Sequence, residues 1–148
     1  MFKYFFGSPT TIPTLRLSGV IGQTGMLRSG LTMQGINKLI EKLFSDKKNP
    51  VVALIINSPG GSPTQSSLIA DSIILNAKKK NKKVIAFVED VAASGGYWLA
   101  CAADEIYIDQ NSIIGSIGVI SPGFGFVSLL KKLGIERRIY TSGRSKSF

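Results

Sequence analysis

One serine and two pairs of glycines carry the groups in this sequence that are best suited to chemistry. Residues 91–96 read Val-Ala-Ala-Ser-Gly-Gly and join a strand-like apolar run to a helix-like run, with Ser94 presenting the hydroxyl. A serine at the first turn of a helix has its Oγ near the positive end of the helix dipole, beside free backbone N–H groups. That position suits an acyl-transfer nucleophile. Serine is also a preferred N-cap residue, so this segment alone is equally consistent with a structural role.

The second glycine pair lies in residues 57–61, Asn-Ser-Pro-Gly-Gly, directly after the apolar run 51–56. Adjacent glycines allow positive φ and let backbone N–H groups approach a ligand that a Cβ would hold away. A Pro-Gly-Gly sequence is also an ordinary strand-to-helix turn. The segment therefore becomes informative only together with Ser94.

Histidine is absent from the sequence. A Ser-His-Asp triad, a Cys-His pair and a histidine metal site are therefore excluded within this chain. A serine nucleophile needs another base, and a lysine can serve only if burial lowers its pKa by several units from about 10.4. The single cysteine, Cys101, excludes an internal disulfide, and its alanine neighbours predict a buried thiol.

The composition fits one globular domain. The chain has 148 residues, a formal net charge of +9 and 16 glycines, which favours an α/β protein with tight turns. Its densest basic run, residues 78–83, falls at the end of a predicted helix, where cations complement the helix dipole. Without interleaved aromatic residues or a base-reading module we expect no nucleic-acid partner, whereas an anionic membrane surface suits the charge. Apolar runs stay well short of the ~20 residues of a membrane helix, and residues 1–6 are too short for a signal-peptide core.

The elements that must position these residues alternate between strands and helices. Short apolar or alternating runs predict strands, and apolar positions at helical spacing predict helices. The predicted strands are 14–21, 51–56, 84–88, 104–109, 113–120 and 136–141, and the predicted helices are 32–47, 65–80, 97–103 and 126–133. Such alternation is typical of parallel βαβ units, whose loops at the carboxyl ends of the strands form the site. We therefore expect Ser94, Gly61 and Ser116 to lie close together.

Four motifs follow one another along nearly the whole chain. They are Asn-Ser-Pro-Gly-Gly at 57–61, Ala-Ser-Gly-Gly-Tyr-Trp at 93–98 with Ala-Asp at 103–104, Gly-Ser-Ile-Gly-Val at 115–119, and Ser-Gly-Arg-Ser-Lys at 142–146. In these motifs and their order the sequence resembles the signal peptide peptidase A family of serine peptidases. The resemblance implies the layered α/β fold of Clp protease and crotonase, built from parallel βαβ units.

The resemblance also implies roles for individual residues. Ser94 corresponds to the nucleophile of a Ser-Lys dyad and Lys146 to its general base, with Ser116 helping to hold the lysine. The two N–H donors of the oxyanion hole correspond to Gly61 and Gly95. The remaining expected site residues, which would bind substrate, are Asn57, Gly60 and Gly96. No cofactor and no metal ion are expected.

The function implied in this way is that of a serine endopeptidase, which cleaves remnant signal peptides or other membrane-associated peptides through an acyl-enzyme. A homo-oligomer associated with a membrane surface is expected, in the cytoplasm or at the periphery of the inner membrane of a bacterium. The sequence carries no evident signal peptide or membrane-spanning helix.

Two departures from these relatives leave alternatives open. Clp protease uses a histidine that this chain lacks, which argues against that relative. The peptidase domain of the family continues past its lysine, so we expect residues 1–12 to be an N-terminal extension and residues 13–148 a peptidase domain truncated just after Lys146. The alternatives are a crotonase-type enzyme acting on acyl-CoA, whose usual glutamates have no evident counterpart, and a catalytically weak assembly module.

Overall fold

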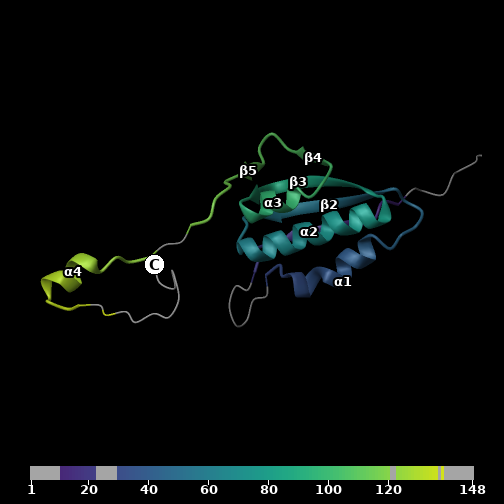
Figure 1. The fold of residues 1–148 in the computed structure, drawn as a ribbon. Helices are drawn as coiled ribbons and strands as arrows, with labels where there is room; N and C mark the ends of the chain where they lie inside the picture. The colour runs from purple at the N-terminus through teal and green to yellow at the C-terminus, as the bar shows by residue number, and fades with distance from the viewer. Residues whose placement is uncertain (1–10, 23–29, 121–122, 137, 139–148) are drawn as a thin grey trace, which may run out of the picture.

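Strands and helices alternate along the chain as predicted (Figure 1). The computed structural model describes residues 11–22, 30–120, 123–136 and 138. The strands are β1 (Thr14–Ser18), β2 (Val51–Ser58), β3 (Lys83–Ala93), β4 (Glu105–Ile108) and β5 (Ile113–Gly115). The helices are α1 (Met33–Leu43), α2 (Pro63–Lys80), α3 (Gly95–Ala100) and α4 (Val127–Lys132).

All strand pairs of the sheet are parallel, in the order β1-β2-β3-β4, with β5 also pairing with β3. This confirms the α/β prediction. The long strand β3 has two partners on the same side: β4 pairs with residues 85–88 and β5 with residues 91–93. Because β5 pairs with the last residues of β3, the chain that follows β5 reaches the point where β3 ends.

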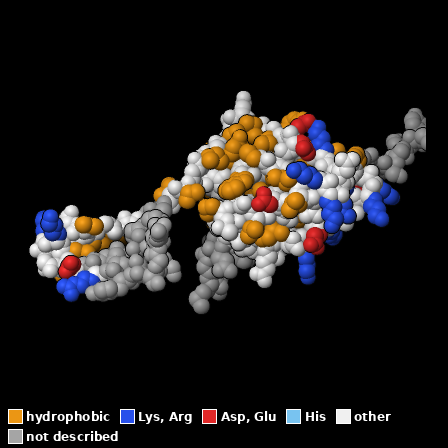
Figure 2. Space-filling model, in the orientation of Figure 1, with side chains coloured by type: hydrophobic (Ala, Val, Ile, Leu, Met, Phe, Trp, Pro, Cys, Tyr) orange, Lys and Arg blue, Asp and Glu red, His pale blue; other side chains and the backbone are white. Residues whose placement is uncertain are grey.

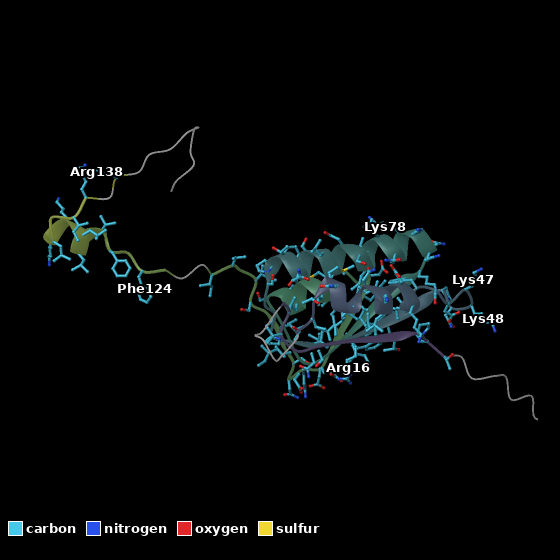
Figure 3. All side chains as sticks on the ribbon, turned by 90° about the horizontal axis from the view of Figure 1, so that it is seen from below. Arg16, Lys47, Lys48, Lys78, Phe124 and Arg138 are labelled. Carbon is cyan, nitrogen blue, oxygen red and sulfur yellow. The ribbon has the colours of Figure 1, made fainter. Side chains whose placement is uncertain are left out.

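Helices α1, α2 and α3 cover one face of the sheet (Figures 1 and 3). Alternate residues of the central strands point into this layer, as the period of two in a strand requires. The buried strand residues include Leu15, Leu17, Val52, Leu54, Ile56, Val84 and Ala86. They form one core cluster with the helix residues Ile36, Ile40, Ile69 and Ile73.

The other face of the sheet carries no helix in the described part of the chain, and Arg16 lies on it (Figure 3). The register places Arg16, Ile55, Phe87 and Tyr107 side by side in one row. Phe87 and Tyr107 stack with ring centroids 5.5 Å apart. Arg16 forms a bidentate ion pair with Glu89, at 2.5 and 2.6 Å. This face is therefore mixed, with an apolar middle and a charged edge.

Several boundaries differ from the prediction. β3 continues to Ala93 rather than ending at residue 88, and β5 ends at Gly115 rather than continuing to residue 120. α3 begins at Gly95 and ends at Ala100, where the prediction was 97–103. The expected strand 136–141 lies largely outside the described residues.

The prediction of a buried thiol at Cys101 is wrong, since Cys101 is exposed. α3 is only 6 residues long and Cys101 is its C-cap. Burial of the neighbours Ala100 and Ala102 does not extend to Cys101, because successive helical positions point in different directions.

Candidate active site

Ser94 occupies a sharp corner between β3 and α3. Its backbone has φ 51° and ψ −118°, a conformation that side-chain-bearing residues rarely adopt. Its N–H donates to the carbonyl of Gly115 at 2.7 Å, so the neighbouring strand holds the corner. Although Ser94 is the N-cap of α3, its side chain makes no capping hydrogen bond. The hydroxyl therefore does not perform the structural role that serine usually has at this position.

The Pro-Gly-Gly loop packs directly against this corner. Gly60 has φ +94°, and a Cβ on it would lie 2.6 Å from the Ala93 carbonyl oxygen, 2.8 Å from the Gly95 nitrogen and 2.9 Å from the Ser94 Cβ. A side chain at residue 60 would thus collide with the backbone of the corner. The two glycine-rich segments of the sequence form one junction, and a glycine is required where they touch.

Two backbone N–H groups at this junction find no acceptor among the residues that the structure describes. The carbonyl of Gly60 accepts from the N–H of Ile21 at 2.9 Å, and the N–H of Ser62 donates to the carbonyl of Ile21 at 2.8 Å. Within the described residues, neither the Gly61 N–H nor the Gly95 N–H donates a hydrogen bond. Gly95 is the first residue of α3, where a free N–H is expected. Paired free donors next to a hydroxyl can stabilise an oxyanion.

An open groove of about 530 Å³ joins Gly61 to Ser94. It is lined by Gly61, Pro63, Ser94 and residues 116–120. Ser116 also has a positive φ, 53°, directly after Gly115 at 101°. The expectation that Gly61, Ser94 and Ser116 lie close together is therefore confirmed. Lys146 lies outside the described residues.

The three residues expected to bind substrate have clear structural contacts. Asn57 Nδ2 donates to Asp90 Oδ2 at 2.8 Å. Gly96 is buried, and a Cβ there would lie 2.4 Å from the Ser58 carbonyl oxygen. Gly60 is buried too, because it packs on the Ser94 corner. These contacts account for the residue types, and contact with substrate stays a prediction.

Two buried serines near the junction are absent from the sequence-based prediction. Ser58 and Ser66 are both 0% exposed. The alternation in β2 could have identified Ser58, since Val52, Leu54 and Ile56 put every second residue on the buried face. Helical spacing could have identified Ser66, since it lies three, four and seven residues before the buried Ile69, Ala70 and Ile73. Its contact is tertiary: a Cβ on Gly95 would lie 2.2 Å from the Ser66 Oγ.

Shifted pKa values occur away from the groove. A hydrogen bond from Lys83 lowers the pKa of Glu105, and the same bond raises the pKa of Lys83. Hydrogen bonds from the Lys48 N–H and the Asn49 side chain lower the pKa of Asp46. Among the described residues, no group of three acidic or cysteine side chains could hold a metal ion. In the same residues, no helix is both long and apolar enough to span a membrane.

Comparison with known proteins relates this site to one family. Residues 76–148 match the model of peptidase family S49. The matched part contains Ser94, Ser116 and Lys146. A putative signal peptide peptidase of Enterococcus faecium is 34% identical over 139 residues, covering 91% of this chain and 40% of that protein. Protease 4 of Haemophilus influenzae is also 34% identical, covering 88% of this chain and 21% of that protein. Residues 76–148 are thus similar to peptidase family S49.

Another relative has a different name. The Na(+)/H(+) antiporter NhaA of Brucella melitensis is 54% identical over 145 residues, which are 97% of this chain and 20% of that protein. The chain thus spans between a fifth and two fifths of the length of these curated relatives. Among solved structures, ClpP1 from Listeria monocytogenes is 25% identical with a TM-score of 0.47, covering 62% of this chain and 46% of that chain.

Proposed function

We propose that this chain carries the catalytic centre of a serine peptidase, with Ser94 as its nucleophile. The observation that carries the proposal is the Ser94 corner itself. A serine at φ 51° and ψ −118° without a capping bond is strained and has its hydroxyl available. Strain of this kind is stored at functional sites, and a strand-to-helix turn that exposes a serine is a recurring arrangement of hydrolases.

The proposed reaction is acyl transfer to Ser94. The Ser94 Oγ attacks the carbonyl carbon of a peptide bond while its proton passes to the neutral amine of Lys146. The carbonyl oxygen becomes an oxyanion that accepts hydrogen bonds from the N–H groups of Gly61 and Gly95. The C–N bond then breaks, the lysine returns its proton to the departing amine, and water hydrolyses the acyl-enzyme. Ser116, in the same groove, is proposed to help hold the lysine.

The proposed substrates are apolar peptides, including remnant signal peptides. The groove wall contains Ile117, Val119 and Ile120, whose side chains are 69%, 74% and 89% exposed. These side chains can cover apolar residues of an extended peptide. The name of the Enterococcus relative agrees with such substrates. The antiporter name belongs to a protein of which the matching part is one fifth, so we carry no transport activity over to this chain.

We also propose a homo-oligomer that works in the bacterial cytoplasm or at the surface of the inner membrane. Large apolar side chains are exposed after β5: Phe124 is 91% exposed, Val127 80% and Leu133 62%. Exposed apolar surface of this kind is typical of contact sites.

Labelling with a fluorophosphonate probe tests the nucleophile. We expect the wild-type chain to be labelled once, at Ser94, and Ser94→Ala to lose the label while keeping its circular dichroism spectrum. Ser45→Ala is the matched control, because Ser45 is exposed and, within the described part of the chain, its hydroxyl bonds only to the carbonyl of Lys42. Undiminished labelling of folded Ser94→Ala would contradict the assignment. A folded wild-type chain that is never labelled would favour the assembly module.

A further inference from the structure

The hydroxyl of Ser58 lies beneath the loop that ends in Gly61. Ser58 is the last residue of β2 and is 0% exposed, among the apolar residues of the helix-covered face. Its Oγ donates to the carbonyl of Gly19 at 2.7 Å and accepts from the N–H of Gly60 at 3.1 Å. Both bonds connect backbone groups that have few alternatives in a buried position. The hydroxyl therefore joins the chain after β1 to the Pro-Gly-Gly loop.

Residues 19–21 hold this loop from one side at several points. The Gly19 N–H donates to the Asn57 carbonyl at 2.9 Å, and the Ile21 N–H donates to the Gly60 carbonyl at 2.9 Å. In a trans peptide the C=O and the following N–H point in opposite directions. With the Gly60 carbonyl directed at Ile21, the Gly61 N–H must point away from it. The direction of this proposed oxyanion donor is thus set by the bonds around Gly60.

Gly60 is the residue at which the backbone of this loop can most easily rotate. With φ +94° and no side chain, it has more rotational freedom than any other residue type. One of its peptide planes is fixed by the bond from Ile21 and the other by the bond to Ser58. Loss of the Ser58 bond frees the Pro59–Gly60 peptide, and the Gly60–Gly61 peptide is then held only by the bond from Ile21, next to a glycine that no longer has a fixed φ.

We propose that Ser58 is a positioning residue whose hydroxyl orients the Gly61 N–H toward the oxyanion. This inference rests on the proposed peptidase function. Loss of an oxyanion-hole donor lowers turnover by roughly 10²–10³-fold in serine peptidases. Since Ser58→Ala misdirects the donor without deleting it, we expect kcat to fall by about 10–100-fold and KM to change by less than about threefold.

The experiment compares three variants of the full chain with the wild type on a chromogenic peptide substrate. Ser58→Ala removes both hydrogen bonds, whereas Ser58→Cys keeps the volume and a weak donor and acceptor. Ser112→Ala is the matched control. The Ser112 Oγ also donates to one backbone carbonyl, that of Glu89 at 2.5 Å, and accepts from one backbone N–H, that of Asp109 at 3.2 Å.

Rates are measured well below the melting temperature of each variant, so that the folded fraction is equal. Affinity for a peptide boronic acid, which forms a tetrahedral anion at the serine, is measured beside kcat and KM. We expect kcat to be highest in the wild type, lower in Ser58→Cys and lowest in Ser58→Ala. The affinity for the boronic acid should fall in the same order, whereas Ser112→Ala should lose stability and keep its kcat.

The outcomes separate the two proposals. Wild-type kcat in both folded Ser58 variants, with Ser94 still labelled, would overturn the role of Ser58 and leave the peptidase proposal standing. A raised KM with unchanged kcat would also overturn the positioning role, since such a change would indicate that Ser58 contacts the substrate. If Ser58→Ala does not fold, Ser58→Cys decides in the same way. A folded wild-type chain that neither hydrolyses peptide nor reacts at Ser94 would overturn both proposals.

Discussion

Ser94 has a backbone conformation that its side chain opposes. The strain at φ 51° and ψ −118° is maintained by bonds on both sides, from its N–H to Gly115 and from the Trp98 N–H to its carbonyl, at 3.0 Å. Conformations of this kind cost of order 1–3 kcal/mol in residues other than glycine. The position of the hydroxyl is thus obtained at the expense of stability.

Replacing Ser94 by glycine should therefore stabilise the fold while abolishing activity. We expect Ser94→Gly to be about 1 kcal/mol more stable than Ser94→Ala, because glycine adopts this φ without strain but has greater freedom when unfolded. Urea unfolding of the two variants and the wild type measures the difference. A glycine variant less stable than the alanine variant would show that the corner is unstrained.

The proposed base predicts a dependence of activity on pH. A lysine accepts the Ser94 proton only in its neutral form, so kcat/KM should rise as the pH is raised through the pKa of Lys146. Lys146→Arg should reduce activity to the level of Ser94→Ala, since a guanidinium stays protonated. Initial rates measured between mildly acidic and alkaline pH provide the test. A flat profile would contradict the dyad.

At the scale of elements, the Ser94 corner depends on three segments that meet at the carboxyl ends of β2 and β3. The loop after β2 supplies Gly60 and Gly61, and β5 pairs with β3 so that Ser116 lies on the same groove as Ser94. The Ile21 backbone is the third part, because it bonds to both sides of Gly61. None of these contacts is local in sequence, so they form together when the sheet forms.

Gly60→Ala should damage both stability and activity. The added Cβ meets backbone atoms at 2.6 and 2.8 Å and imposes strain at φ +94°, so we expect a loss of about 2–4 kcal/mol and a strong decrease in labelling of Ser94.

Gly19→Ala separates crowding from backbone strain. Gly19 has the same φ, +94°, but nothing lies within 4 Å of its Cβ position. Chemical denaturation of both variants measures the two losses. Equal losses of stability would mean that close packing of the loop on the Ser94 corner contributes nothing.

At the scale of the whole molecule, five lysines gather at the end of the sheet opposite Ser94. Lys47 and Lys48 follow α1, and Lys78, Lys79 and Lys80 form the last turn of α2. Figure 3 labels Lys47, Lys48 and Lys78 at this end, and blue side chains gather there in Figure 2. Among the described residues, none of these five lysines forms an ion pair. This lysine end is the part of the molecule that suits an anionic lipid surface.

Vesicle sedimentation tests this association. Each lysine near an anionic surface contributes about 1 kcal/mol at low ionic strength, so we expect binding to phosphatidylserine-containing vesicles that high salt abolishes. A Lys47→Glu, Lys48→Glu, Lys79→Glu triple variant should lose binding and keep its Ser94 labelling, whereas Lys131→Glu with Lys132→Glu in α4 serves as the control. Equal sedimentation with phosphatidylcholine alone would exclude an electrostatic origin.

The sequence alone determined those features that depend on local pattern. Strand and helix positions follow from hydrophobic periods, so the parallel α/β fold and the helices α1 and α2 could be predicted closely. The glycines at 60 and 61 also indicated that the backbone there could take a positive φ, as it does. The common groove of Gly61, Ser94 and Ser116 could also be expected, because the loops after parallel strands gather at one edge.

Only the tertiary structure decided how the groups at this edge are held. The pairing of β5 with the end of β3, the backbone angle of Ser94 and the bonds from Ile21 and Ser58 all join segments distant in sequence. A hydrophobic period reports whether a residue is buried, but it does not report which backbone group a buried hydroxyl will meet. That depends on strand register, and register is set by the packing of the whole sheet.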